Sequence, residues 1–342
     1  MMKLQSDDHT KLLIIAPYGI GNLLLLYPVM KVLHGKGIEY DVLSYLKSVH
    51  QILQERPEFR CLYNKNIYVP NKATAAISAI MTVRAARYDY SVVSFPSAKP
   101  HYNVLSFMCG AKHRIGSLYP DSNTRRLSFL NTINVPVTVG ISDVYQNKKL
   151  IDPIGLGVTD EELPYYELKA GKEKRIGFHV GCKYADRYRR WPLDNWKKLI
   201  EMIEKSCPGY ELVMYFGPDE KEELSFFSAW NNPRLNIKPT LTLNQLFEDI
   251  GRCSIFLSND SGLMHISAFM GCRSISIWGP SDFRRTRPFS KDAVIIHGNA
   301  SCRPCSHSYS AASHEFNCPF NIKCLSDITA EEVYGILNPY VS

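Results

Sequence analysis

The sequence contains no internal repeat and no low-complexity tract, and we expect no secretory signal. Its first ten residues, MMKLQSDDHT, are polar and acidic, and no small-residue cleavage site follows the first apolar run. A signal peptide would need a basic start and such a cleavage site. We therefore expect a cytoplasmic protein.

Charged residues are absent from Leu12 to Met30, a run of nineteen residues that is long enough to raise the question of a membrane span. Its composition argues against one, because two prolines and two glycines interrupt it. We instead expect a buried strand over Leu12–Ala16, a glycine turn, and a helix that begins near Asn22. This pattern is typical of the start of a doubly wound domain.

Acidic residues are scarce in the first half of the chain. Residues 1–150 contain 18 Lys/Arg and 9 Asp/Glu, a balance of +9, whereas residues 151–342 contain 22 and 24, a balance of −2. The excess indicates an anionic partner, such as a phosphorylated saccharide or an acidic membrane surface, although solubility alone would also account for a basic domain. We expect no nucleic acid partner, because no recognition helix, zinc-finger spacing or aromatic RNA-binding motif accompanies the charge.

The length and a hydrophobic content of 45% predict two domains. We place the first domain at 1–150, a linker at 151–172, the second domain at 173–328, and a C-terminal helix at 329–342 that could return to the first domain. Alternating strands and helices indicate an α/β fold. The strands expected in the first domain are 12–16, 39–44, 67–69, 90–94 and 114–116, and the helices are 23–33, 73–87 and 102–108. Segment 119–140 is expected to form an irregular arm or a β excursion near the acceptor side.

The second half alternates in the same way. The expected strands are 175–181, 211–217, 254–258 and 274–278, and the helices are 192–206, 218–230, 243–252 and 263–270. Two polar turns each follow a strand, and in parallel sheets such turns meet at the carboxyl edge, where ligands bind. They supply Asp260, Ser261 and Gly262 before a helix N-terminus, and Arg284, Arg285 and Arg287. This set suits a phosphorylated ligand, although an ordinary helix cap and solvated arginines would show the same residues.

Five segments carry a resemblance in their residues, order and spacing. They are LLIIAPYGIGNLLLLYP (12–28), RYRRWPLDNW (187–196), FGPDEKEEL (216–224), SNDSGLMHISAFMG (258–271) and IWGPSDFRRTRP (277–288). Together they resemble glycosyltransferase family 9, the bacterial heptosyltransferases of lipopolysaccharide synthesis. The resemblance implies a GT-B fold, in which two doubly wound Rossmann-like domains face each other across a cleft. It also implies an acceptor site in the first half, a nucleoside-diphospho-sugar site in the second, and inverting transfer without a divalent metal.

The resemblance places the donor diphosphate against Asp260, Ser261, Gly262 and Leu263, with His265 close by. Helix N-terminal amides and an imidazole would stabilise the negative charge that develops on the departing nucleotide. The alternative for His265 is a core histidine that is hydrogen-bonded to a loop carbonyl.

Three further positions match the donor site of the family. Arg189 matches its basic residue before Trp-Pro and would clamp a phosphate, with Arg190 or a surface ion pair as the alternative. Glu220 matches the carboxylate that accepts hydrogen bonds from the ribose, although it could simply complement a helix dipole. Asp282 would orient either the sugar or Arg284.

The acceptor side departs from the family pattern at one position. Gly19 and Gly21 match the glycine turn, but Asn22 stands where the family has an aspartate that acts as general base. An amide cannot take up the acceptor proton, so either another group acts as base or the proton leaves late, to water or to donor phosphate. Asn22 itself could bond the acceptor or cap a helix. Other candidate bases in the first half are Asp7, Asp8, His101 and Asp143.

Ten cysteines are present, and four of them lie close together in the sequence: Cys302, Cys305, Cys318 and Cys324, with His307 and His314 between them. In the cytosol, free thiols or metal ligands are expected rather than disulfides. The spacing suits a structural, tetrahedral Zn²⁺ or iron site that holds the loop 302–324, and no catalytic metal is expected. Redox-active or merely buried thiols are the alternative.

These patterns predict a glycosyltransferase that moves a sugar, such as a heptose, from a nucleoside-diphospho-sugar to a lipopolysaccharide-like or other glycan or glycolipid acceptor. We expect it in the cytoplasm or peripherally bound to the inner face of the cell membrane. Two alternatives remain. One is a nucleotide-sugar epimerase of GT-B fold, and the other is a nucleotide-binding pseudoenzyme, which the loss of aspartate at Asn22 favours.

Overall fold

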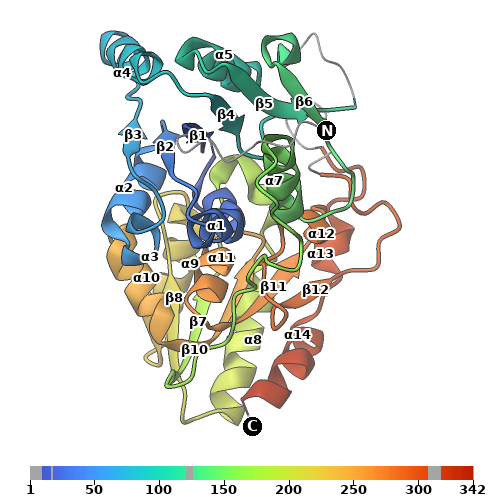
Figure 1. The fold of residues 1–342 in the computed structure, drawn as a ribbon. Coiled ribbons are helices and arrows are strands. Elements are labelled where there is room, and N and C mark those ends of the chain that lie inside the picture. Colours follow the sequence, from blue (N-terminus) through green and yellow to red (C-terminus); the bar gives the residue numbers. More distant parts are fainter. Residues whose placement is uncertain (1–9, 17, 121–125, 307–316, 342) are drawn as a thin grey trace. The chain divides into compact units, whose positions relative to one another are not determined.

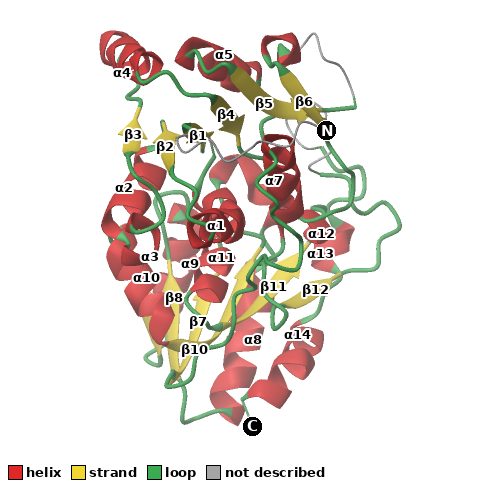
Figure 2. Ribbon diagram, in the orientation of Figure 1, coloured by secondary structure: helices red, strands yellow, loops and turns green. Residues whose placement is uncertain are grey.

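The structure is a computed structural model that describes residues 10–16, 18–120, 126–306 and 317–341. These residues form two compact units that divide between Pro164 and Tyr165. Each unit contains a parallel six-stranded sheet with helices packed on it (Figure 1 and Figure 2). The division falls inside segment 151–172, which the sequence assigns to a linker. In the described ranges, no helix combines the length and apolarity that a membrane crossing requires.

The sheet of the first unit has the strand order β3-β2-β1-β4-β5-β6. Its strands are β1 (Leu12–Ile15), β2 (Tyr40–Ser44), β3 (Asn66–Tyr68), β4 (Tyr90–Val93), β5 (His113–Leu118) and β6 (Ile133–Pro136). Its helices are α1 (Ile20–Gly35), α2 (Lys47–Glu55), α3 (Pro57–Arg60), α4 (Ala73–Ala85), α5 (Pro100–Cys109) and α7 (Asp143–Ile151), with short 3₁₀ helices η1 (Ser128–Leu130) and η2 (Asp152–Ile154). The strand order reverses between β1 and β4, and the carboxyl ends of such strands are where open α/β sheets bind ligands.

The central strand β1 explains why the first apolar run folds as it does. All four of its residues are buried, as expected for a strand of a parallel sheet that is covered on both faces. The following helix α1 buries nine of its sixteen residues, so the long run without charges belongs to a protein core.

The helices α2, α3 and α7 of the first unit were not expected from the sequence. Helix α2 was not expected, although Val49, Ile52 and Leu53 form its buried stripe at helical spacing. Helix α7 begins directly after Ser142, whose hydroxyl accepts a hydrogen bond from the amide of Val144. No helix was predicted at this position. The segment 119–140, for which an irregular arm or a β excursion was expected, supplies the edge strand β6, so the β excursion is the alternative that the structure shows.

The sheet of the second unit has the order β12-β11-β10-β7-β8-β9. Its strands are β7 (Glu173–His179), β8 (Glu211–Tyr215), β9 (Leu235–Lys238), β10 (Cys253–Asn259), β11 (Arg273–Trp278) and β12 (Val294–His297). Its helices are α8 (Leu193–Ser206), α9 (Lys221–Trp230), α10 (Leu243–Arg252), α11 (Gly262–Phe269), α12 (Phe283–Thr286), α13 (Lys323–Ser326) and α14 (Ala330–Leu337), with 3₁₀ helices η3 (Tyr184–Arg189) and η4 (Asn338–Tyr340). The outer strands β9 and β12, which have only four residues each, were not expected from the sequence.

The last helix corrects one prediction. Thr329 and Glu332 form a capping box at the start of α14, and Val333 and Leu337 are fully buried in the core that the helix α8 also enters. The helix therefore belongs to the second unit, and the expectation that it could return to the first domain is wrong.

Candidate functional site

The turn between β10 and α11 presents a helix N-terminus at the carboxyl edge of the second sheet. Ser261 is the residue before the helix, but its hydroxyl makes no hydrogen bond to an α11 amide. The first N–H groups of a helix need acceptors from outside the helix, and anions commonly supply them. The neighbouring Asp260 is only 3% exposed, so the turn is built into the protein rather than displayed on its surface.

The Ser261 hydroxyl instead joins a chain of three buried groups. It lies 2.9 Å from Nδ1 of His179, the last residue of β7. The other ring nitrogen of His179 lies 3.6 Å from a carboxylate oxygen of Glu220, which precedes α9. All three side chains are less than a tenth exposed. The ring of His179 therefore links the carboxylate to the hydroxyl that stands at the start of α11.

Glu220 is held inside the second unit. Its second carboxylate oxygen accepts a hydrogen bond from the amide of Gly217, and a side chain at Gly181 would collide with it, because an added Cβ would lie 2.0 Å from Cγ of Glu220. Burial opposes ionisation, but His179, the Gly217 amide and Arg190 together hold the pKa of Glu220 below its usual value. Glu220 is therefore a buried carboxylate that fixes the His179 ring. A contact with a ribose stays a prediction.

Arg189 stands beside the same turn. One of its terminal nitrogens donates to the carboxylate of Asp260 at 3.1 Å, and the other pairs with Asp186. Burial lowers the pKa of Arg189, but the two carboxylates outweigh it and raise the pKa above its ordinary value. Its buried Nε has no hydrogen-bond partner among the described residues. The side chain is thus a fixed cation that keeps an unused donor.

Arg190 has a different role from its neighbour. Its guanidinium donates to the carbonyl oxygens of Cys182 and Asp219 and pairs with Glu223. Cys182 and Asp219 belong to the loops after β7 and β8, and Glu223 belongs to α9, so the side chain ties these parts of the second unit together. The Nε of Arg190 is also without a hydrogen-bond partner among the described residues, but only Arg189 contacts Asp260 in the turn before α11. The position of Arg189 therefore favours it, and not Arg190, as a residue that is available to a ligand.

His265 lies in the first turn of α11, and its side chain is almost fully buried at 4% exposure. Burial lowers its pKa from 6.5 to about 4, although Asp260 partly opposes that effect. The imidazole is therefore neutral at neutral pH. The alternative expected from the sequence was a core histidine that is hydrogen-bonded to a loop carbonyl. The Nδ1 atom of His265 makes no such bond, because it has no hydrogen-bond partner among the described residues.

Asp282 and Arg284 pair with each other in the second polar turn. Asp282 accepts a bond from the amide of Arg284 at 3.2 Å and two more from its guanidinium, at 2.8 and 2.9 Å. Burial would raise the pKa of Asp282, but Arg284 outweighs this effect and lowers it. Of the two expected roles for Asp282, orientation of Arg284 is the one with a contact in the structure.

The loop with the cysteines is attached to the same region. The amides of Cys305 and Ser306 both donate to the carbonyl of Pro280 at 3.0 Å, and the Ser306 hydroxyl lies 2.9 Å from that of Tyr188. Tyr188 precedes Arg189, whose guanidinium lies 5.9 Å from the centre of the tyrosine ring. The loop therefore supports both polar turns from one side.

The four cysteines are free thiols. Burial, followed by the nearby Cys302 and Cys318, raises the pKa of the Cys305 thiol. Among the described residues, no three His, Cys, Asp or Glu side chains are close enough to hold a metal. His307 and His314 lie outside the described residues. A structural Zn²⁺ or iron therefore stays a prediction.

On the acceptor side, Gly19 precedes α1, and Gly21 and Asn22 lie in its first turn. Asn22 is therefore not the residue that caps this helix, which corrects one expected alternative. The first turn of α1 contains no acidic residue. Of the other candidate bases, His101 is exposed and Asp143 is buried at the start of α7, while Asp7 and Asp8 lie outside the described residues.

Comparison with known proteins decides the family. The family model for glycosyltransferase family 9 (heptosyltransferase) matches residues 83–314. The chain belongs to glycosyltransferase family 9. This result confirms the resemblance carried by the motifs of this sequence.

Family 9 relatives match the chain over different lengths. Lipooligosaccharide heptosyltransferase 2 of Campylobacter jejuni is 27% identical over 48% of this chain and 51% of its own, so the chain spans about half the length of that relative. Lipopolysaccharide heptosyltransferase 3 of Escherichia coli is 26% identical over 92% of this chain and 93% of its own. The solved structure of Escherichia coli ADP-heptose LPS heptosyltransferase II is similar with a TM-score of 0.74 at 20% identity, over 97% and 98% of the two chains. This likeness confirms the predicted GT-B class with two Rossmann-like domains.

His179 and Asn259 are two further residues of the candidate site that the sequence motifs did not identify. Asn259 is fully buried, accepts from the Trp191 amide at 3.1 Å and donates to the Val180 carbonyl at 2.5 Å. Both residues are polar and end an apolar strand, and this is the signal that could have identified them.

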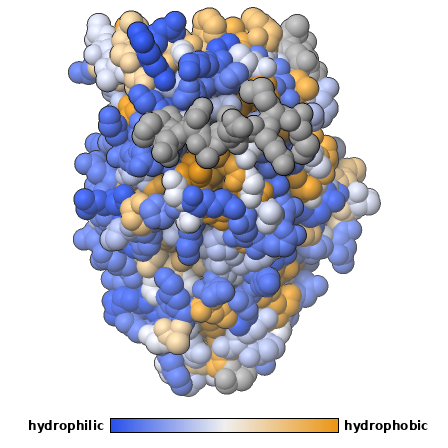
Figure 3. Space-filling view, viewed as in Figure 1, coloured by the Kyte–Doolittle hydropathy of each residue, from blue (hydrophilic) through white to orange (hydrophobic). Residues whose placement is uncertain are grey.

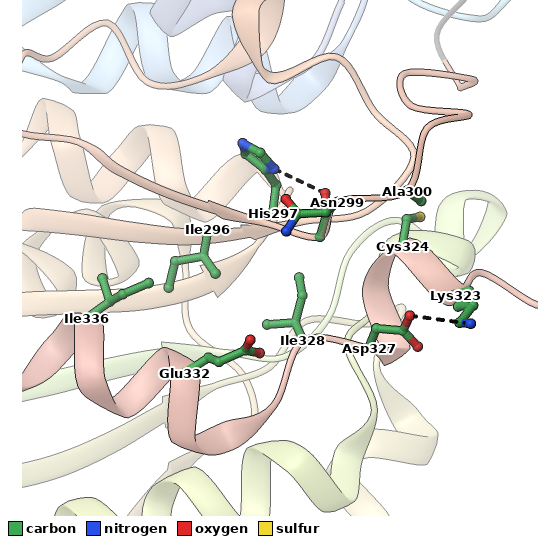
Figure 4. Close-up of a pocket in the computed structure, with 11 residues that line it drawn as sticks. Ile296, His297, Asn299, Ala300, Lys323, Cys324, Asp327, Ile328, Glu332 and Ile336 are labelled. Atoms are coloured by element: carbon green, nitrogen blue, oxygen red, sulfur yellow. Dashed lines mark hydrogen bonds and ion pairs between the residues drawn. The ribbon is translucent and has the colours of Figure 1, made fainter.

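A pocket of about 660 Å³ lies elsewhere in the second unit. Figure 4 shows Ile296, Ile328 and Ile336 pointing into it. Its acidic residues already have partners, because Glu332 caps α14 and Asp327 lies 4.0 Å from Lys323. None of its lining residues belongs to the two polar turns, and we assign it no role in the reaction.

Proposed function

We propose that this family 9 member is an inverting glycosyltransferase that moves a sugar from a nucleoside-diphospho-sugar to a lipopolysaccharide-type acceptor. Family membership supports the reaction class. The similarity to Escherichia coli ADP-heptose LPS heptosyltransferase II makes ADP-heptose the first donor to test. In such a reaction an acceptor hydroxyl oxygen attacks the anomeric carbon while the bond from that carbon to the diphosphate oxygen breaks.

The observation that carries the proposal is a set of unused polar groups around one turn. They are the first amides of α11, which have no side-chain cap, the buried Nδ1 of His265 and the buried Nε of Arg189. A buried polar atom without a partner costs on the order of 1–3 kcal/mol, so a protein retains such atoms where a ligand completes them. Two linked phosphates would supply the missing acceptors. Arg189 and the helix dipole would stabilise the negative charge of these phosphates.

We propose that His179 sets the direction of the Ser261 hydroxyl. When the ring donates from Nε2 to Glu220, its Nδ1 accepts from Ser261, and the lone pairs of that hydroxyl face the turn. When the ring carries its hydrogen on Nδ1, this nitrogen donates to Ser261, and the Ser261 hydrogen is free to bond a phosphate oxygen. His179 is thus a positioning residue that acts through Ser261.

Acceptor-dependent release of ADP from ADP-heptose tests the proposed activity. Release of ADP only when a truncated lipopolysaccharide acceptor is present would support transfer. Isomerised donor without acceptor would establish the epimerase instead. Tight binding of ADP with no turnover would establish a nucleotide-binding pseudoenzyme.

Replacing Asn22 with aspartate should raise turnover at saturating substrates by about tenfold. A general base contributes roughly 10²–10⁴-fold, and the existing proton acceptor already supplies part of that gain. The position lies in the first turn of α1, where the helix dipole keeps a carboxylate ionised. Comparison with Asn22→Ala, which removes the amide without adding a base, isolates the effect. Equal rates for Asn22→Asp and the unmodified protein would place the base elsewhere.

We also propose that the four cysteines bind a structural metal. The amide of Ile322 donates to the sulfur of Cys318 at 3.3 Å. Burial raises the pKa of the Cys324 thiol to about 11, although the nearby Arg303 guanidinium opposes that effect. A bound metal would have to displace the thiol protons, because the thiolate is the form that ligates it. Elemental analysis should find about one Zn or Fe per chain, and Cys302→Ser with Cys305→Ser should remove it. Cys207→Ser, which changes a buried cysteine outside the loop, should retain the metal. Metal-free protein with an unchanged melting temperature would reject the site.

A further inference from the structure

Large apolar side chains are exposed together on two helices of the first unit. Ile77 and Met81 lie one turn apart on α4 and are 56% and 58% exposed. Phe107 and Met108 lie in the last turn of the helix α5 and are 48% and 39% exposed. Single exposed apolar residues are common on proteins, but a group of four large ones indicates an interaction surface.

Contacts between the two helices join these residues into one surface. The guanidinium of Arg84, three residues after Met81, donates to the carbonyl of Met108 at 3.2 Å. The guanidinium of Arg114 lies 5.5 Å from the centre of the Phe107 ring. We call this surface the α4–α5 face and define it by four apolar and four basic residues: Ile77, Met81, Phe107 and Met108, with Lys72, Arg84, Arg87 and Arg114.

The α4–α5 face lies in the most basic part of the chain. Residues 59–120 contain eight Lys/Arg and one acidic residue, a balance of +7, which equals the net charge of the whole protein. That acidic residue, Asp89, is already paired with Lys112 at 2.7 Å. Lys72 and Arg87 are exposed just before and just after α4. Figure 3 shows hydrophobic residues along the top of the view, where α4 and α5 lie in Figure 1, with hydrophilic residues beside them.

We propose that the α4–α5 face docks on an anionic lipid bilayer. Apolar side chains that enter the interface, flanked by basic ones that contact lipid phosphates, are the combination that holds proteins on such membranes. A second copy of the chain is disfavoured, because it would bring two surfaces of the same strong charge together. The inference rests on the proposed function, since a lipopolysaccharide-type acceptor is anchored in a membrane.

Vesicle co-sedimentation of the full chain tests the proposal. Vesicles of phosphatidylcholine with phosphatidylglycerol should bind the protein, and vesicles of pure phosphatidylcholine should bind it far more weakly. Each basic residue is worth about fivefold in partitioning, so Lys72→Gln with Arg87→Gln should weaken binding about 25-fold. Ile77→Gln with Met81→Gln should weaken it at least about tenfold, and high salt should weaken binding of the unmodified protein.

Lys205→Gln with Ile336→Gln is the matched control, because it removes an exposed lysine and a 38% exposed isoleucine from the second unit. It should bind vesicles like the unmodified protein. All variants should keep their affinity for ADP, so loss of vesicle binding alone is separable from failure of the donor site. Unchanged vesicle binding by both face variants would overturn the proposal, as would no binding by the unmodified protein. A dimer in sedimentation velocity that both face variants abolish would show a protein interface instead.

Discussion

Replacing Arg189 with methionine is expected to lower the affinity for ADP by about 10- to 100-fold. A hydrogen bond to a charged group contributes on the order of 1.5–3 kcal/mol, and Arg189 combines a fixed charge with an unused Nε donor beside the α11 N-terminus. Arg189→Lys keeps the charge but loses the planar fork, so we expect it to recover only part of the affinity. Titration calorimetry with ADP measures all three proteins.

Arg190→Met provides the contrast, because it changes an adjacent arginine of the same type. This side chain bonds the carbonyls of Cys182 and Asp219 and pairs with Glu223. Its removal leaves a buried carboxylate unpaired and should lower the melting temperature, while the folded fraction keeps its affinity for ADP. If Arg190→Met weakened ADP binding as much as Arg189→Met does, both effects would reflect the fold and not a phosphate contact.

Local patterns were sufficient to predict the two α/β domains. Buried strands such as β1 and β10 are short apolar runs that end at polar turns, and these properties are visible within a few residues. The helix α10 was predicted with its observed bounds, because a threonine cap precedes a strongly amphipathic segment. The four-residue strands β9 and β12 were missed because such short runs also occur in loops.

The candidate site was predictable only in part, since its decisive contacts join residues that are distant in sequence. The motif identified Ser261, but its partner His179 lies 82 residues earlier. The hydrophobic periodicity of a segment cannot predict a contact between two residues so far apart in the sequence. The position of α14 failed for the same reason, because its apolar stripe specifies that a face is buried and not which domain buries it.

Protonation of His265 should give the protein a steep loss of stability in mild acid. Burial sets its folded pKa at about 4, below the 6.5 of an exposed histidine. The unfolded chain therefore binds the proton first, so stability is complete above pH 6.5 and falls as the pH drops toward 4. One pKa unit corresponds to about 1.4 kcal/mol, so the free energy of unfolding should fall by about 3 kcal/mol over this range. Denaturant unfolding of the unmodified protein and of His265→Leu, each at pH 6.5 and at pH 4, measures this effect. The contribution of His265 is the difference between the losses of unfolding free energy in the two proteins.

The same titration distinguishes a ligand residue from a core residue. A diphosphate beside His265 would stabilise the imidazolium and raise its pKa, so the affinity for ADP should increase as the pH falls below 6.5 in the unmodified protein, beyond the change seen for His265→Leu. Calorimetry in buffers of different ionisation enthalpy should then show proton uptake on binding. His34→Gln, which changes an exposed histidine, should retain both behaviours. If His265→Leu altered only the pH dependence of unfolding, the imidazole would be a buried core group and the diphosphate would lie away from it.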